Sequence, residues 1–227
     1  MDKRFLAILT AIIVVFGGIF IFSQRSSNGS GGSTLGSQTQ VSNHVTGQGE
    51  KKVTLLEYGD FQCSACEAYE PVLKQVRTAY AKDIYFQFRN LPLVSIHPNA
   101  FAAARAAEAA SLQNQFWEMH DILYNQTNWQ GWTVSTSPID SFKTYAQQLG
   151  LDVAKFQSDF ASENVNSTIQ ADLGAFKKTG KQMATPTFFL DGTYLDNTKL
   201  TDQNNRPLFE KFKAVLDTEI SKQQPKQ

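Results

Sequence analysis

The only two cysteines of this 227-residue chain stand three residues apart, in the segment Cys63-Ser64-Ala65-Cys66. They follow a β-rich apolar run, Val53–Tyr58, that is typical of a buried strand. After them the apolar residues between positions 68 and 81 recur at helical spacing. The pair is therefore expected at the junction between the end of a strand and the start of a helix. At this spacing, a disulfide can open and close with little movement of the backbone.

This position favours a reactive sulfur at Cys63. The first turn of a helix has unpaired N–H groups and the positive end of the macrodipole, and both favour a negative charge. A thiol at such a position has its pKa lowered from ~8.5 to a value between about 3.5 and 7.5, and the thiolate is the nucleophile. Cys66, one turn further along, is expected to be more buried. The pattern predicts a redox-active pair.

Two other interpretations of the pair are weaker. Half of a zinc site would need two more ligands, and the three histidines, His44, His97 and His120, do not repeat a tight ligand spacing. A purely structural disulfide closing so short a loop would constrain the unfolded chain very little. We therefore expect no metal and no other cofactor. A tethered, non-redox binding module whose disulfide is only structural remains the alternative of a different class.

The first 23 residues predict a transmembrane anchor. Phe5–Phe22 is an apolar run of 18 residues interrupted only by Thr10, Gly17 and Gly18. As a helix it would span ~27 Å, close to the ~30 Å hydrocarbon thickness of a bilayer. Lys3 and Arg4 precede it, so the positive-inside rule predicts a cytoplasmic N-terminus with the rest of the chain outside. A leader cleaved within the following Ser/Gly tract is the alternative.

Residues 24–50 are rich in Ser, Gly, Asn, Gln and Thr, and this composition predicts a flexible linker. The folded domain is then expected to occupy residues 51–223. The chain has 21 basic and 21 acidic residues, so its formal net charge is zero. A nucleic-acid-binding protein would normally carry a basic excess or a basic stripe. No nucleic-acid partner is therefore expected.

The order of the predicted elements indicates an α/β fold. A strand, the helix after the cysteines and a second strand, 84–88, form a βαβ unit, which favours parallel pairing. Helical patterns then fill residues 97–180, and His120 shares an apolar helix face with Phe116 and Met119. The strand pattern returns at 186–195 around Asp191-Gly192, a strong hairpin signal, and a last helix follows. We expect one mixed sheet with helices on both faces and an inserted helical subdomain.

Four separated segments resemble the DsbA-like branch of the thioredoxin superfamily and occur in the order of that branch. They are Val53–Cys66, His97–Ala100, Phe116–Asp121 and Ala184–Gly192. The resemblance covers roughly residues 50–222. It implies a thioredoxin-like fold with a helical insertion, and disulfide exchange with protein substrates outside the cytoplasm.

The resemblance also implies roles for individual residues. Cys63 matches the nucleophilic cysteine of the family and Cys66 the resolving one. Pro186 matches the proline that is cis in this fold and faces the cysteines, so Thr185 and Pro186 are expected to bind an extended substrate. Glu57 matches a buried acidic residue, and strand alternation places it on the same face as Val53 and Leu55. There it is expected to exchange a proton with Cys66, with a pKa raised by burial.

The motif departs from the best-known members of this branch, because Ser64-Ala65 contains neither the proline nor the histidine found there. The motif therefore indicates disulfide exchange but leaves its direction open. We expect oxidation of thiols in exported proteins, with a membrane quinone-linked partner for reoxidation as a further implication of the resemblance. A reductase or isomerase that uses the same pair is the alternative. The expected location is the cell membrane, with the catalytic domain outside.

Overall fold

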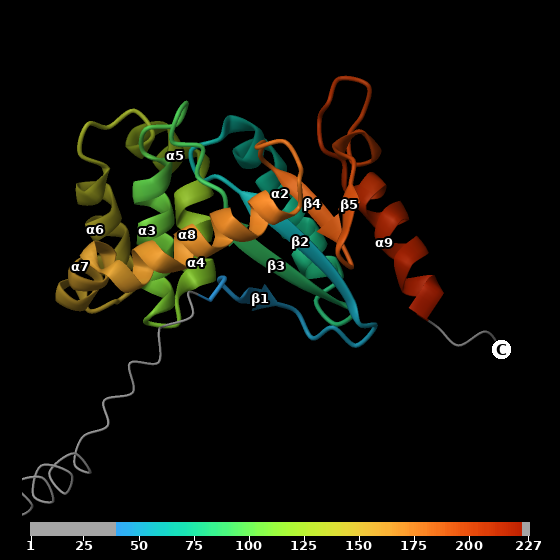
Figure 1. Ribbon diagram of the computed structural model, residues 1–227, viewed down its shortest axis with the longest axis horizontal. Coiled ribbons are helices and arrows are strands. Elements are labelled where there is room, and N and C mark those ends of the chain that lie inside the picture. Colours follow the sequence, from blue (N-terminus) through green and yellow to red (C-terminus); the bar gives the residue numbers. More distant parts are fainter. Residues whose placement is uncertain (1–39, 224–227) are drawn as a thin grey trace, which may run out of the picture. The chain divides into compact units, whose positions relative to one another are not determined.

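The computed structural model describes residues 40–223, which form one sheet and a set of helices (Figure 1). The strands are β1 (His44–Thr46), β2 (Val53–Gly59), β3 (Ile84–Asn90), β4 (Thr187–Leu190) and β5 (Thr193–Leu195). The helices that pack on the sheet are α2 (Ser64–Ala79), α8 (Glu163–Lys178) and α9 (Phe209–Gln223), with a short 3₁₀ turn, η1 (Asn197–Lys199). The remaining helices are α3 (Ala100–Ser111), α4 (Phe116–Tyr124), α5 (Gln126–Trp132), α6 (Pro138–Gln148) and α7 (Val153–Ala161).

The sheet has the strand order β1-β3-β2-β4-β5 and is mixed. Strands β2 and β3 run parallel, because α2 returns the chain to the end of the sheet at which β2 begins. The other strand pairs are antiparallel. The central strand β2 places Glu57 between Phe88 of β3 and Phe188 of β4. The predicted α/β fold with one mixed sheet and a helical insertion between β3 and β4 is confirmed.

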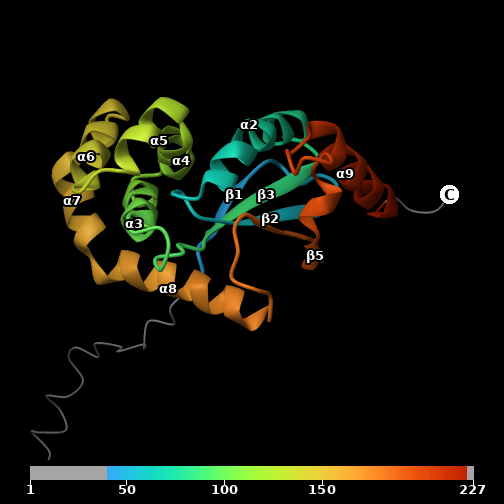
Figure 2. The same ribbon diagram turned by 90° about the horizontal axis from the view of Figure 1, so that it is seen from above.

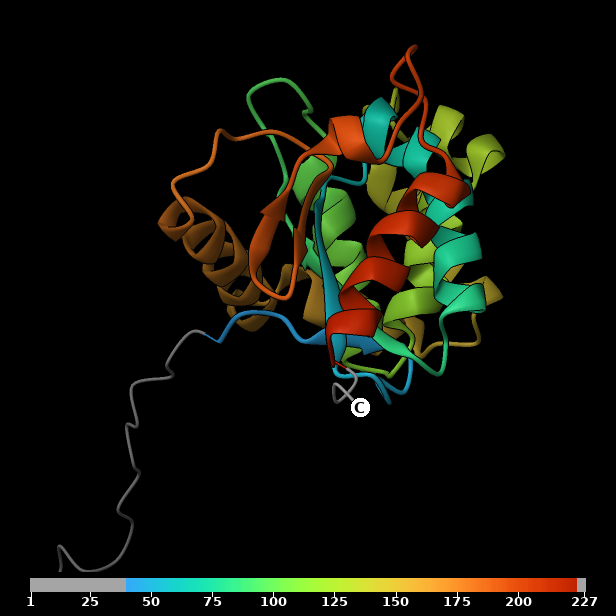
Figure 3. The same ribbon diagram turned by 90° about the vertical axis from the view of Figure 1, so that its right-hand side faces the viewer.

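Helices cover both faces of the sheet (Figures 2 and 3). One face packs against α2 and α9 through a core that includes Leu55, Leu73 and Phe212. The long helix α8 crosses the other face, where Tyr58 and Phe176 meet edge to face. The two faces alternate along β2, as expected for a strand buried on both sides.

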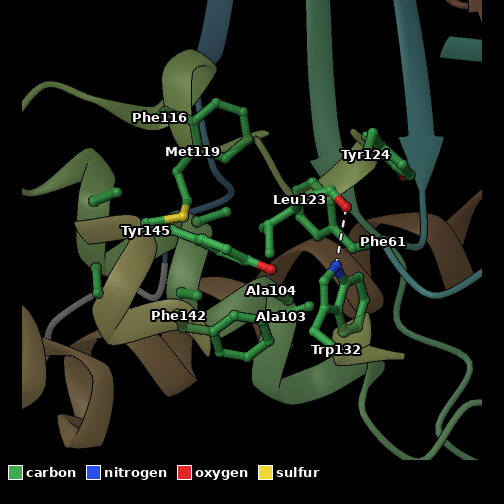
Figure 4. Close-up of a cluster of buried hydrophobic side chains, with 14 of the residues drawn as sticks. Phe61, Ala103, Ala104, Phe116, Met119, Leu123, Tyr124, Trp132, Phe142 and Tyr145 are labelled. Carbon is green, nitrogen blue, oxygen red and sulfur yellow. Dashed lines mark hydrogen bonds between the residues drawn. The ribbon is translucent and has the colours of Figure 1, made fainter. Parts of the chain in front are cut away.

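The inserted helices have a separate core that closes against the loop before the cysteines. Helix α3 is rich in alanine, and these small side chains let α4, α6, α7 and α8 approach it closely. Phe61 from that loop joins the aromatic side chains of this core, among them Tyr124 (Figure 4). Trp132 donates its indole N–H to the carbonyl of Leu123 at 3.0 Å, so this large side chain is buried with its polar atom paired.

Residues 44–46 were expected in the flexible linker, and that part of the prediction is wrong. They form β1, which pairs with β3 at the edge of the sheet. The Nε2 atom of His44 lies 2.7 Å from a carboxylate oxygen of Glu108, and Ser42 donates to both oxygens of Asp172. The polar residues that look like linker in the sequence are buried here because helices α3 and α8 supply their partners.

Residues Gln126–Trp132 were expected within the helical insertion but not as a separate helix, because the segment is short and has no clear apolar stripe; they form α5. Asn125 begins it, accepting a hydrogen bond from the N–H of Asn128. The predicted hairpin, in contrast, is confirmed, and both Asp191 and Gly192 have the positive φ angles of a tight hairpin turn.

No helix within residues 40–223 is long and apolar enough to cross a membrane. The predicted anchor at residues 1–23 lies outside the described residues.

Candidate active site

The two cysteines begin α2 and face the interior of the fold. Cys63 is the N-cap residue, in an extended conformation, and its carbonyl accepts the first helical hydrogen bond, from Glu67. Its side chain is at the surface edge, with 8% of the residue exposed, whereas Cys66 is fully buried. Both sulfurs are free thiols. The predicted position at a strand-to-helix junction is confirmed.

The surroundings of Cys63 stabilise its thiolate. A hydrogen bond from the Cys66 thiol is the main reason that the pKa of Cys63 falls from 9.0 to about 5. The Thr185 side chain and the N–H groups of Ala65 and Cys66 lower the pKa further, while burial opposes them. At pH 7, about two units above this pKa, Cys63 is therefore mostly a thiolate, by roughly 100 to 1.

Cys66 has the opposite tendency. Burial raises the pKa of its thiol well above the ordinary value, and the neighbouring Cys63 and Glu57 raise it further. Cys66 therefore stays protonated at neutral pH and serves as the hydrogen-bond donor to Cys63. Its sulfur can only act as nucleophile or leaving group if a nearby base takes or returns this proton.

Thr185, which precedes Pro186, lies directly against Cys63, although more than a hundred residues separate them in the sequence. The carbonyl oxygen of Thr185 is 3.5 Å from the Cys63 sulfur, and the Thr185–Pro186 bond is cis, as expected. The carbonyl of Pro186 accepts a hydrogen bond from Asn197 at 2.9 Å. The buried Thr185 hydroxyl has no hydrogen-bond partner among residues 40–223. It is therefore available to donate a hydrogen bond to the Cys63 thiolate.

Glu57 lies in the middle of β2 on the face that packs under α2, as strand alternation predicted. Only 1% of the residue is exposed. Burial, followed by the negative charge of Glu70, raises the pKa of Glu57 well above its ordinary value, and Arg77 partly offsets this. One carboxyl oxygen has no hydrogen-bond partner within the described part of the chain. Glu57 is thus a buried carboxyl beside Cys66 that keeps its proton to a higher pH than an exposed glutamate does.

The sequence analysis missed a charged cluster behind Glu57. Arg77 of α2 donates to Glu70, one oxygen of which is 2.6 Å away, and to Asp121 of α4 at 3.0 Å. Its guanidinium also lies over the Trp117 ring, 5.4 Å from the centroid. Glu70 and Arg77 are seven residues apart on one helix, so their shared face could have been noted from spacing alone.

This cluster is not a convincing metal site. Donor atoms of Glu70, His120 and Asp121 do lie within 4.8 Å of one another. However, Arg77 is already paired with both carboxylates. His120 is fully buried among aromatic rings, as its apolar helix face predicted, and it contacts Asp121 through Nδ1.

Contacts from the helical insertion hold the loop before Cys63. The buried carboxylate of Asp60 accepts hydrogen bonds from the N–H groups of Gln62 and Leu93, and His97 lies 2.7 Å from it. Trp129 of α5 donates its indole N–H to the carbonyl of Phe61 at 2.8 Å. The sequence did not show the supports from Leu93, His97 and Trp129, because each joins segments far apart along the chain.

The thioredoxin family profile matches residues 39–216, most of the chain. The chain belongs to this family. Similar solved structures include a thioredoxin-like oxidoreductase from Silicibacter pomeroyi, 20% identical, with a TM-score of 0.63 over 81% of this chain and 94% of that one. BdbD from Bacillus subtilis is 20% identical, with a TM-score of 0.62 over 79% and 93%. Alpha-DsbA1 from Wolbachia pipientis is 18% identical, with a TM-score of 0.63 over 80% and 92%.

These neighbours share the fold of this thioredoxin-family chain. The family match and the Cys63–Cys66 pair support a thiol–disulfide oxidoreductase at this general level. The similar curated sequences are larger proteins. Na(+)/H(+) antiporters from Salinispora tropica and Salinispora arenicola are 37% and 39% identical over 149 residues, 66% of this chain. The match spans 22% of the length of each antiporter.

Proposed function

We propose that this chain is an extracytoplasmic thiol–disulfide oxidoreductase that introduces disulfides into exported proteins. The observation that carries the proposal is the geometry of two sulfurs one helical turn apart, one at the start of α2 near the surface and one fully buried behind it. Cys63, at the edge of the fold beside Thr185, is held as a thiolate, and Cys66, behind it, is held as a thiol. A structural disulfide has no need of such a difference.

In the oxidising direction the Cys63–Cys66 disulfide reacts in two steps. A substrate thiolate attacks the Cys63 sulfur, the Cys63–Cys66 bond breaks, and Cys66 leaves with the bonding electron pair and takes up a proton. A second substrate thiolate then attacks the substrate sulfur of the mixed disulfide. Cys63 leaves as a thiolate, the substrate gains a disulfide, and the enzyme is left with two reduced cysteines.

The low pKa of Cys63 favours this direction. A stabilised thiolate stabilises the reduced pair, and a stable reduced form is what makes such an enzyme a strong oxidant. The same thiolate is a good leaving group in the second step, since thiols of lower pKa leave faster. In this proposal, Glu57 gives Cys66 its proton in the first step and takes it back on reoxidation; its burial beside Cys66 supports the role.

The reduction potential tests the direction most directly. Equilibration with glutathione should give a value well above about −200 mV, whereas a value near −270 mV would indicate a reductase. The oxidised chain should also form disulfides in a reduced, unfolded substrate protein with stoichiometry of one per chain. A Cys63–Cys66 bond that resists thiols would show that the pair is structural and would overturn the proposal.

The proposal includes the cell membrane as the site of action, with a membrane quinone-linked protein as the reoxidising partner. It is supported by the apolar run at Phe5–Phe22 and the preceding Lys3 and Arg4. Protease added to intact cells should digest the domain. Digestion only after permeabilisation would place the domain on the other side of the membrane.

A further inference from the structure

The sheet face opposite α2 and α9 carries a groove that disulfide exchange does not use. It lies between α8 and strands β2, β3 and β4, and its volume is about 440 Å³. We call it the α8 groove, and the residues that matter here are Leu56, Tyr58, Arg89, Gly174, Lys178 and Phe189. Pockets for small organic molecules typically have volumes of about 300–1,000 Å³. The groove is therefore large enough for such a ligand.

A glycine in the middle of α8 keeps the groove open. Gly174 has no left-handed backbone angle, and nothing lies within 4 Å of the position that a Cβ atom would occupy there. Neither conformation nor close packing thus requires glycine at this position. Glycine is also unfavourable in a helix interior compared with alanine. Its effect on the structure is to leave space along the wall of the groove.

Arg89 supplies a positive charge at the same place. One Nη atom donates to the Tyr58 hydroxyl at 3.1 Å, and Nε is buried without an acceptor among residues 40–223. No acidic side chain lines the groove within the described residues. Lys178, also on the wall, adds a second positive charge, although in the last turn of α8 it also offsets the helix dipole.

The remaining walls are apolar, with Leu56 and Phe189 on the sheet side. A guanidinium that lines the groove beside apolar side chains, with no acidic side chain in the lining, suits a carboxylate, which can accept its outer N–H groups and neutralise the charge. We propose that the α8 groove binds a small organic carboxylate with an alkyl or aryl body. The carboxylate pairs with Arg89, and the body lies against Leu56 and Phe189.

Amide NMR spectra of the full chain test this with 4-phenylbutyrate as the probe. Added 4-phenylbutyrate should shift the amide signals of Gly174 and Gly192 in a saturable way. The neutral 4-phenylbutanamide and the cationic 4-phenylbutylamine should bind at least about tenfold more weakly, because each lacks the charge-assisted hydrogen bond. Equal binding of the three compounds, or no saturable shift of these signals, would overturn the proposal.

Two pairs of variants locate the site. Arg89→Met should weaken 4-phenylbutyrate at least about tenfold, whereas Arg206→Met, which removes a positive charge that does not line the groove, should bind normally. Gly174→Leu should fill the groove and abolish binding, while Gly174→Ala should retain it. Undiminished binding by both Arg89→Met and Gly174→Leu would overturn the site. If Arg89→Met does not fold, the Gly174 pair alone decides the outcome.

Discussion

The cysteine site has two parts, the mouth around Cys63 and the interior around Cys66. They shift the pKa of a thiol in opposite directions. At the mouth, Cys63 meets hydrogen-bond donors from Cys66, Thr185 and the first turn of α2, and the pKa of its thiol falls. In the interior, Cys66 is surrounded by buried side chains and a carboxyl, and the pKa of its thiol rises. One helical turn is enough to separate a stable anion from a stable thiol, because burial without donors penalises charge.

The largest expected effect comes from deleting either sulfur. Cys63→Ala should abolish disulfide exchange, because the remaining thiol is buried and protonated. Cys66→Ala removes the main hydrogen bond that lowers the pKa of Cys63, but it should leave a reactive thiol that attacks substrate disulfides and cannot be released, so long-lived mixed disulfides should accumulate. Non-reducing gels after reaction with an oxidised substrate measure both. Mixed disulfides that accumulate through Cys66 in the Cys63→Ala variant would reverse the roles of mouth and interior.

Glu57→Gln should have the next largest effect and act on the interior alone. Without a carboxyl to exchange a proton with Cys66, the step that ionises Cys66 should slow by roughly 100-fold. Rapid-mixing kinetics should show this loss, with alkylation of Cys63 nearly unchanged. Glu108→Gln removes another buried carboxyl, which contacts His44 and lies in the helical insertion, and provides the control. Equal exchange rates for Glu57→Gln and the unmodified chain across pH 6 to 8 would reduce Glu57 to a structural residue.

The pH dependence of the free energy of unfolding should also distinguish Glu57 from a carboxyl with an ordinary pKa. Because its folded pKa is raised above 4.5, the folded state holds a proton that the unfolded state has lost, and this contribution to stability fades as pH rises. The stability of Glu57→Gln relative to the unmodified chain should therefore grow above pH 4.5, by up to about 1.4 kcal/mol per pH unit. Urea unfolding at several pH values measures the difference, and a constant difference would show that Glu57 titrates normally.

Thr185→Val tests the mouth. Removing the hydroxyl should raise the pKa of Cys63 above its value of about 5, by roughly one unit, since a hydrogen bond to the thiolate is lost. The thiolate absorbance at a series of pH values measures this, and Thr185→Ser, which keeps the hydroxyl, should titrate like the unmodified chain. If valine and serine have the same effect, the hydroxyl does not stabilise the thiolate.

Trp129→Phe should have the smallest effect, because it removes one hydrogen bond to the loop that carries Cys63. The loss is about 1 kcal/mol of stability, and the exchange rate should fall slightly as the loop loosens. Trp132→Phe is the matched control, since its indole hydrogen bond goes to the carbonyl of Leu123 and not to the loop. A larger effect of Trp132→Phe on the exchange rate would show that the helical insertion supports the site in another way.

The local parts of this site could be predicted from the sequence, because short-range patterns determine them. The spacing of Cys63 and Cys66 and the apolar runs around them predict the strand, the helix and the cysteine at its start. Period-two alternation placed Glu57 on the correct face of β2. These predictions depend on neighbours a few residues away, where backbone geometry leaves few choices.

Only the tertiary structure decided which distant groups surround those residues. No local pattern brings Arg77 to Asp121, Trp129 to the carbonyl of Phe61, or Arg89 to a groove lined by Gly174. The same holds for β1, whose polar residues look like linker until Asp172 and Glu108 pair with Ser42 and His44. Buried polar groups need partners, and folding brings together partners that lie tens of residues apart in the chain. The sequence alone thus determined the reactive pair and its fold, while the packing determined the ionisation of each group.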